Sequence, residues 1–205
     1  MKVIDITKTI SHDTPIFPGD IPPIITEHKS SSVNGDGVFV SELHLTTHSG
    51  THIDAPAHIK LGGLGMSSFP VEFIEGNARV IDIAWLKKFE TITNQPKNIA
   101  NLGRNLRMLI FASNSKSKKI PRLQPWLVDY LKHSGIGIIA TDLLSIDQID
   151  DKFLYNHKLI LGKNIWVAEN LDLSNIEHGY YRYIFAPLKT AANDGAPARA
   201  LLIKD

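Results

Sequence analysis

A short segment rich in histidine constrains this chain more than any other part of the sequence. The fifteen residues from His44 to His58 hold four of the nine histidines, together with Asp54. His and Asp are common ligands of first-row metals, and several of them in one segment are typical of a metal site. Gly50 and Pro56 in the same stretch fix the shape of the backbone. We therefore predict a metal-binding strand followed by a turn.

Within this segment the candidate ligands His48, His52 and Asp54 all occupy even positions. In an extended backbone, side chains two residues apart lie on the same face, so these three would converge. A helix would also bring positions 48 and 52 together, as in zinc proteases, but Gly50 and the β-branched residues around His52 disfavour a helix. The glutamate that follows the first histidine of the protease motif is here Ser49. The pattern thus indicates a strand.

The alternative interpretation is a set of partly buried histidines that hydrogen-bond to their neighbours. We apply it to the histidines that stand apart from the three candidates, namely His12, His28, His44, His133 and His178. Three protein ligands would leave a metal under-ligated or leave room for a second ion, so a distant side chain should complete the set. Glu169 ends an apolar run, where a solvated charge would be out of place, and His157 precedes another such run. Both are candidates for the missing ligands.

Elsewhere the apolar pattern predicts short strands that alternate with a few helices. Residues 125–133 have helical spacing, with Gly135 as the stop, and a second helix is expected within 147–161, around His157, with Gly162 at its end. Extended segments are predicted at 1–10, 24–30, 38–48, 77–83, 108–112, 136–141, 165–169, 180–188 and 198–203, with a tight reversal at 33–37. Because strands outnumber helices and interleave with them, we expect an α/β fold with a mixed β-sheet and flanking helices, in one domain over residues 1–205.

Composition argues against several classes of function. The formal charge of +1 disfavours nucleic acid or an anionic membrane as the main partner, because both require a concentrated basic face. No segment approaches the roughly eighteen apolar residues needed to cross a bilayer, and the chain opens like a strand rather than a signal peptide, so we expect a cytoplasmic protein. The chain has no cysteine, so any metal must be held by histidines and carboxylates.

The segment His48-Ser-Gly-Thr-His-Ile-Asp-Ala-Pro-Ala-His58 resembles the signature of the metal-dependent cyclase family, whose best-known members are bacterial kynurenine formamidases (arylformamidases). Further matches lie at 17–20 (Phe-Pro-Gly-Asp), at 141–147, at His157 and Glu169, and at 194–200, so the resemblance covers essentially the whole chain. It implies a compact α/β fold of the swivelling β/β/α type, assembled as a homodimer or a higher oligomer such as a homotetramer.

The resemblance also implies a set of metal ligands. His48, His52 and Asp54 would bind one zinc ion, and Asp54 would bridge to a second zinc held by His157 and Glu169, with manganese as the other candidate metal. The two ions of each subunit would activate a hydroxide. The implied reaction is hydrolysis of N-formylkynurenine to kynurenine and formate, a step of tryptophan catabolism.

Two more residues match positions with a role in the family. His58 matches the proton-transfer residue, which would protonate the leaving nitrogen; a structural histidine that supports the ligands is the alternative. Phe17 occupies a substrate-packing position that is Trp in typical kynurenine formamidases, and Phe offers less area and no indole N–H donor. The alternatives for function are therefore a related hydrolase of another small amide, lactam or ester, similar to isatin hydrolases, or a non-catalytic metal-binding member of the fold.

Three further charged residues admit more than one interpretation. We interpret Asp142 and Asp147 as caps of turns or braces of the sheet rather than as acid/base groups. Arg199 would either orient a substrate carboxylate or form a structural ion pair.

Overall fold

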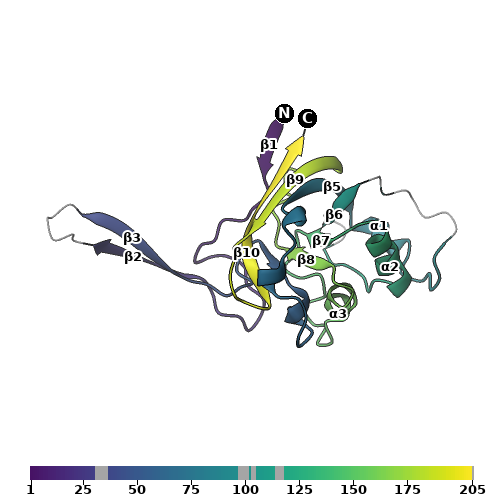
Figure 1. Cartoon of the computed structure of the whole chain (residues 1–205), viewed down its shortest axis with the longest axis horizontal. Coiled ribbons are helices and arrows are strands. Elements are labelled where there is room, and N and C mark those ends of the chain that lie inside the picture. Colours follow the sequence, from purple (N-terminus) through teal and green to yellow (C-terminus); the bar gives the residue numbers. More distant parts are fainter. Residues whose placement is uncertain (31–36, 97–101, 103–104, 114–117, 205) are drawn as a thin grey trace.

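The computed structural model describes residues 1–30, 37–96, 102, 105–113 and 118–204. Eight strands form a mixed sheet in the order β1-β10-β4-β8-β7-β6-β5-β9, and β9 also pairs with β10. The sheet therefore closes on itself like a barrel, and β1 pairs with β10 on the edge opposite β9 (Figure 1). The strand bounds are β1 Lys2–Asp5, β4 His52–Asp54, β5 Glu75–Asp82, β6 Leu106–Ala112, β7 Ile138–Thr141, β8 Trp166–Glu169, β9 Gly179–Pro187 and β10 Gly195–Lys204.

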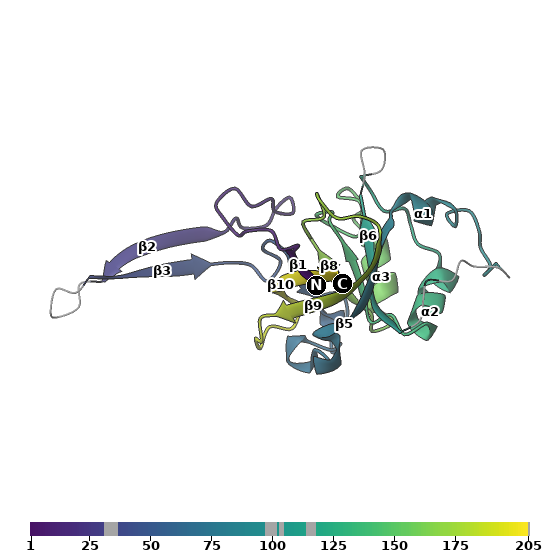
Figure 2. The ribbon, with the colours of Figure 1, turned by 90° about the horizontal axis from the view of Figure 1, so that it is seen from above.

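Strands β5 to β8 run parallel to one another, and three helices cover their outer face. These helices are α1 (Ala84–Lys87), α2 (Pro125–His133) and α3 (Tyr155–Leu161), which lie on the same side of the barrel (Figures 1 and 2). Parallel strands covered on both sides are apolar on both faces. In β6, Met108 and Ile110 belong to the core inside the barrel, whereas Leu109 and Phe111 pack with apolar residues of the helices.

Two strands stand apart from the barrel. β2 (Ile24–Ser30) and β3 (Val38–His44) pair only with each other among the described residues, in an antiparallel register that places Ile24 opposite His44. They form an arm that projects away from the rest of the molecule (Figures 1 and 2). We refer to residues 24–30 and 37–44 as the β2–β3 arm. Residues 33–36 of the predicted reversal lie outside the described part of the chain.

Most of the predicted elements are confirmed. The helix at 125–133 has the predicted bounds, and Gly135 follows it with a φ of 89°. The strands predicted at 136–141 and 165–169 are β7 and β8, and α3 occupies the last part of the predicted 147–161 helical region. None of the described helices combines the length and apolar character required to span a membrane.

The prediction of a continuous strand through His48 was wrong. β3 ends at His44, β4 begins only at His52, and the residues between them form turns. Gly50 lies in these turns with a φ of 65°, a conformation that interrupts an extended backbone. Beyond β4, Pro56–His58 form the short 3-10 helix η1, and two further 3-10 helices occupy Met66–Ser68 and Val71–Phe73.

Candidate metal centre

The centre of the candidate site is β4, a strand of three buried residues. Side chains alternate along a strand, so His52 and Asp54 lie on one face, while Ile53 between them belongs to the barrel core. β4 pairs with β8 in a register that places His52 opposite Glu169. The pairing of two strands far apart in the sequence therefore brings one imidazole and two carboxylates together.

His48 reaches the same point from a turn. The backbone N–H of Ser49 donates to the carbonyl of Thr46 at 3.2 Å, and the hydroxyl of Ser49 accepts from the backbone N–H of Thr46 at 3.1 Å. Gly50 then takes a positive φ, and a Cβ at this position would lie 2.9 Å from Cγ1 of Ile10. Only glycine adopts this conformation at so close an approach without strain, and the turn sets His48 beside β4.

His157 enters the site from α3, and Asp147 fixes the start of this helix. The carboxylate of Asp147 accepts hydrogen bonds from the backbone N–H groups of Asn156 and His157, at 2.7 and 3.0 Å, and from Nδ1 of His157 at 2.8 Å. Because Nδ1 donates its hydrogen to Asp147, Nε2 of a neutral His157 presents its lone pair to the site. Nε2 lies 3.3 Å from Oδ2 of Asp54 and 3.3 Å from Oε1 of Glu169.

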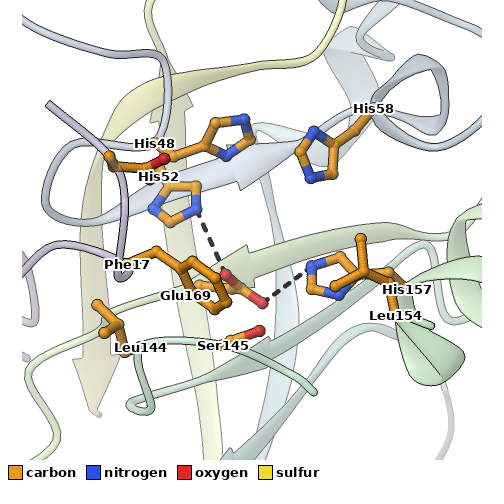
Figure 3. A pocket seen from close by; sticks show the side chains of 10 residues that line it. Phe17, His48, His52, His58, Leu144, Ser145, Leu154, His157 and Glu169 are labelled. Carbon is orange, nitrogen blue, oxygen red and sulfur yellow. Dashed lines mark ion pairs between the residues drawn. The ribbon is translucent and has the colours of Figure 1, made fainter. Parts of the chain in front are cut away.

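Asp54 lies where two sets of potential ligands meet. Nδ1 of His48 and Nε2 of His52 lie 2.8 and 3.3 Å from its Oδ1, and His157 approaches its Oδ2. Among the described residues, three groups are compact enough to hold an ion. Asp54 belongs to two of them, one with His48 and His52 and the other with His157 and Glu169, and the third is His48, His58 and Asp194. Figure 3 shows the imidazoles of His52 and His157 facing the carboxylate of Glu169.

Both carboxylate oxygens of Asp54 are buried, and neither accepts a well-oriented hydrogen bond from the described residues. The imidazole nitrogens are near these oxygens, but they do not meet the geometry of hydrogen bonds. A buried carboxylate without hydrogen bonds is strongly disfavoured unless a cation compensates its charge. This donor set of imidazoles and carboxylates therefore fits a metal ion.

The pKa shifts of Asp54 and His52 also show that the buried carboxylates require nearby positive charge. Burial alone would raise the pKa of Asp54, but the charge of His52 and the close contacts with His157 and His48 hold it well below its ordinary value. Burial alone would lower the pKa of His52, yet the charges of Asp54 and Glu169 raise it to about 10. Without a metal, protons on the imidazoles thus balance the two carboxylates.

His58 lies at the end of η1, beside the imidazoles of the two groups that share Asp54, and it forms the third group with His48 and Asp194. Its ring centroid is 4.5 Å from that of His48 and 5.7 Å from that of His157. Partial burial lowers the pKa of His58 below its ordinary value, an effect that the charge of Asp54 opposes without reversing it. A predominantly neutral imidazole in this position can accept a proton and pass it on.

These side chains border a cavity of about 220 Å³. Phe17, Leu144 and Leu154 contribute an apolar lining to it (Figure 3), and Asp20 and Ser145 add polar groups. Pockets for drug-sized ligands usually measure about 300–1,000 Å³. The cavity therefore suits a small ligand with an apolar part near the cluster of histidines and carboxylates.

Comparison with known proteins assigns the chain to a family. Residues 4–148 match the family model described as "Putative cyclase". A kynurenine formamidase from Salinibacter ruber is 31% identical over 210 residues, which cover 98% of this chain and 97% of the relative. A kynurenine formamidase from Bacillus mycoides is 32% identical over 203 residues, covering 97% and 96%. The chain belongs to the cyclase family.

Solved structures agree with this assignment at the level of the fold. Isatin hydrolase A from Labrenzia aggregata has a TM-score of 0.73 at 21% identity, covering 100% of this chain and 94% of that one. A predicted metal-dependent hydrolase from Bacillus stearothermophilus has a TM-score of 0.71 at 24% identity, covering 98% and 97%. Identity this low supports the fold alone, and it confirms the expected α/β fold with a mixed sheet.

The seven residues of this cyclase-family chain predicted to bind metal, carry a proton or contact substrate lie around one point, namely Phe17, His48, His52, Asp54, His58, His157 and Glu169. Their roles as ligands, proton-transfer group and substrate contact stay predictions. Of the histidines set aside, His44 is exposed on the β2–β3 arm, and His133 on α2 donates to a backbone carbonyl. Arg199 forms an ion pair with Asp5 instead of lining the cavity.

The sequence did not reveal the residues that contact the imidazole nitrogens facing away from Asp54. These residues are Asp194 at His48 and Asp147 at His157. Nε2 of His48 lies 3.2 Å from Oδ2 of Asp194, which also accepts a hydrogen bond from the hydroxyl of Thr47 at 2.6 Å. The only signal for Asp194 was its place in the family motif at 194–200. Asp147 was expected to cap a turn or brace the sheet; it instead caps the start of α3, and its bond to the imidazole of His157 was not expected.

The expected structural role of Asp142 is confirmed. Its carboxylate accepts hydrogen bonds from the backbone N–H and the hydroxyl of Ser113, at 2.9 and 2.7 Å. It thereby joins the ends of β6 and β7. By contrast, nothing in the sequence marked Leu144 or Leu154 as part of the cavity.

Proposed function

We propose that this chain is a metal-dependent amidohydrolase that converts N-formylkynurenine to kynurenine and formate, a step of tryptophan breakdown. Curated relatives about 30% identical over nearly the whole chain carry the name kynurenine formamidase. The observation that carries the proposal is the buried, unsatisfied carboxylate of Asp54 between two groups of ligands. A carboxylate placed in this way would be available as a ligand to both ions of a two-metal site.

We assign two zinc ions to the site. His48 and His52 would hold one ion, His157 and Glu169 the other, and Asp54 would belong to both. Three imidazoles among five ligands favour zinc over manganese, which prefers oxygen ligands. Bound there, the ions would supply Lewis acidity and a water molecule with a lowered pKa.

The residues around the cluster have separable tasks in this reaction. Hydrolysis adds water to the formyl carbonyl and breaks the C–N bond, and the leaving nitrogen needs a proton because an amide anion is a poor leaving group. His58 is the proton carrier in this proposal, since it is largely neutral and lies beside the rings of His48 and His157. Phe17 would pack on the aromatic ring of the substrate.

A second candidate is hydrolysis of a small cyclic amide of the isatin type. Two observations favour it: Phe17 replaces the larger aromatic residue of typical kynurenine formamidases, and the cavity is small for a substrate with an amino-acid side chain. A non-catalytic metal-binding protein is less consistent with a histidine at position 58 next to a complete set of ligands.

Metal analysis combined with two assays tests the proposal. We expect two equivalents of zinc in the purified protein and turnover of N-formylkynurenine, and we expect Asp54→Asn to lose both metal and activity. His44→Ala is the matched control, because His44 is exposed and lies outside the cluster. Protein without bound metal would contradict the metal centre. Turnover of isatin without turnover of N-formylkynurenine would contradict the substrate alone.

We also propose that the protein is a homodimer joined by the β2–β3 arm. Isolated two-stranded hairpins are at best marginally stable in water. This arm pairs with no other described strand, and it exposes apolar side chains, with Val40 50% and Leu43 57% accessible. A second copy would cover these side chains. Light scattering should show a dimer for the wild type and a monomer for Val40→Lys/Leu43→Lys. Leu61→Lys, at an exposed residue outside the arm, should leave the dimer intact.

A further inference from the structure

Leu154 has an unusual backbone conformation. Its φ of 49° and ψ of 52° lie in the left-handed helical region, which an L-residue with a Cβ rarely adopts. The other described non-glycine residues with positive φ are Asn105, Asn164 and Asn170. Asparagine tolerates this region because its short polar side chain can bond to the local backbone, but leucine has no such compensation.

The start of helix α3, which follows Leu154, does not explain why a leucine occupies this position. Leu154 is the N-cap residue of α3, a position where Ser, Thr, Asp and Asn are favoured because they accept a backbone hydrogen bond. Leu154 makes no side-chain cap, and the carboxylate of Asp147 accepts the bonds of the first helical N–H groups instead. The backbone conformation would therefore favour asparagine at position 154, and the helix start requires no particular side chain there.

The cavity supplies the missing explanation. The side chain of Leu154 lines it next to His157, at the edge of the ligand cluster (Figure 3). Phe17 and Leu144 contribute the rest of the apolar lining. Phe17 comes from the segment between β1 and β2, whereas Leu144 and Leu154 both come from the connection between β7 and α3. Strained backbone in a folded protein is concentrated at sites where the strain positions a functional side chain.

We propose that Leu154 determines specificity by packing against the apolar ring of the substrate, and that the strained backbone at this residue is what directs its side chain to the cavity. This inference rests on the proposed function, because it assumes an aromatic amide as substrate. It assigns Leu154 to substrate binding and not to the chemical step. A substitution should therefore change KM for aromatic substrates and leave kcat nearly unchanged.

Leu154→Asn separates this role from a structural one, because asparagine suits the left-handed conformation and Asp147 continues to cap the helix. We expect KM for N-formylkynurenine and Kd for the product kynurenine to rise about tenfold, the effect of losing part of the apolar contact of one leucine. For the non-aromatic substrate N-methylformamide, kcat/KM should be unchanged. The melting temperature should not fall, because relief of strain offsets the lost packing. Zinc content should equal that of the wild type, which shows that α3 still holds His157.

Phe153→Asn is the matched control, since Phe153 is the preceding residue, is 72% exposed and does not line the cavity. It should leave KM and Kd unchanged. Equal changes for aromatic and non-aromatic substrates, an unchanged KM, or a fall of more than about 4 °C in melting temperature for Leu154→Asn would overturn the inference. If the wild type hydrolyses isatin instead of N-formylkynurenine, the proposed substrate fails, and the same comparison with isatin still tests Leu154.

Discussion

Replacing Asp147 with asparagine would test whether a carboxylate outside the cluster controls metal binding. Asp147 accepts three hydrogen bonds, one from the N–H of Asn156 and two from His157, through its backbone N–H and its Nδ1. Asparagine keeps one acceptor oxygen and replaces the other with an NH2 group. If the oxygen continues to face Asn156, the NH2 group meets two donors of His157.

The size of the effect follows from these bonds. A buried donor that loses its acceptor costs about 1–3 kcal/mol, so the free energy of unfolding of the metal-free protein should fall by at least this amount. His157 can relieve the conflict by moving its hydrogen from Nδ1 to Nε2, which removes the lone pair that a metal needs. Loss of such an outer partner typically weakens metal binding about 10- to 100-fold, or about 1.4–2.8 kcal/mol.

Competition with a chromophoric chelator would measure the zinc affinity, and urea titration of the metal-free protein would measure stability. Asp142→Asn is the matched control, because Asp142 holds Ser113 by two hydrogen bonds and does not line the cavity. The hydroxyl of Ser113 can reverse its role towards an amide, so a small loss of stability and an unchanged zinc affinity are expected. Wild-type zinc affinity in Asp147→Asn would refute the reasoning and leave Asp147 as a helix cap only.

Three more perturbations give distinct outcomes. His58→Ala should retain its metal and lose about 10²- to 10⁴-fold in kcat, and unchanged turnover would exclude His58 as the proton carrier. Removal of metal with a chelator should lower the melting temperature, since a metal held at 100 times its Kd contributes about 2.7 kcal/mol; identical melting curves would argue against a bound ion. Gly50→Ala should destabilise the fold by more than about 1 kcal/mol and reduce metal content, because its Cβ would contact Ile10. Gly62→Ala has a similar φ in open space, so a urea titration in which both variants lose equal stability would show that the contact with Ile10 is unimportant.

The sequence was sufficient for elements whose ends carry local signals. α2 starts at Pro125, which lacks the N–H that a first helical residue does not need, and it ends before Gly135, which takes the positive φ that follows a helix. Closure of the barrel was not predictable in this way. It depends on β9 pairing with both β5 and β10, and the alternation of apolar residues does not specify which strands become neighbours.

The sequence indicated the correct residues of the candidate site, but the single extended strand from which we inferred their convergence was partly wrong. The even spacing of His48, His52 and Asp54 suggested one extended strand, yet only His52 and Asp54 share a strand face. His48 arrives through a turn whose hydrogen bonds between Thr46 and Ser49 compete with an extended backbone. Residue type therefore indicated the metal chemistry, whereas the path of the chain could be known only from the structure.

The way the cluster is assembled links metal binding to completion of the fold. β4 lies between β8, which places Glu169 opposite His52, and β10, which places Gly195 opposite Asp54. A Cβ at Gly195 would lie 2.6 Å from the carbonyl of Ile53 and 3.1 Å from the ring of His48, so β10 must pack closely against the site through a residue without a side chain. These pairings join segments far apart in the chain, which form only after a large loss of chain entropy. A partly folded chain therefore lacks the complete set of ligands, and a metal ion will stabilise the closed barrel rather than its precursors.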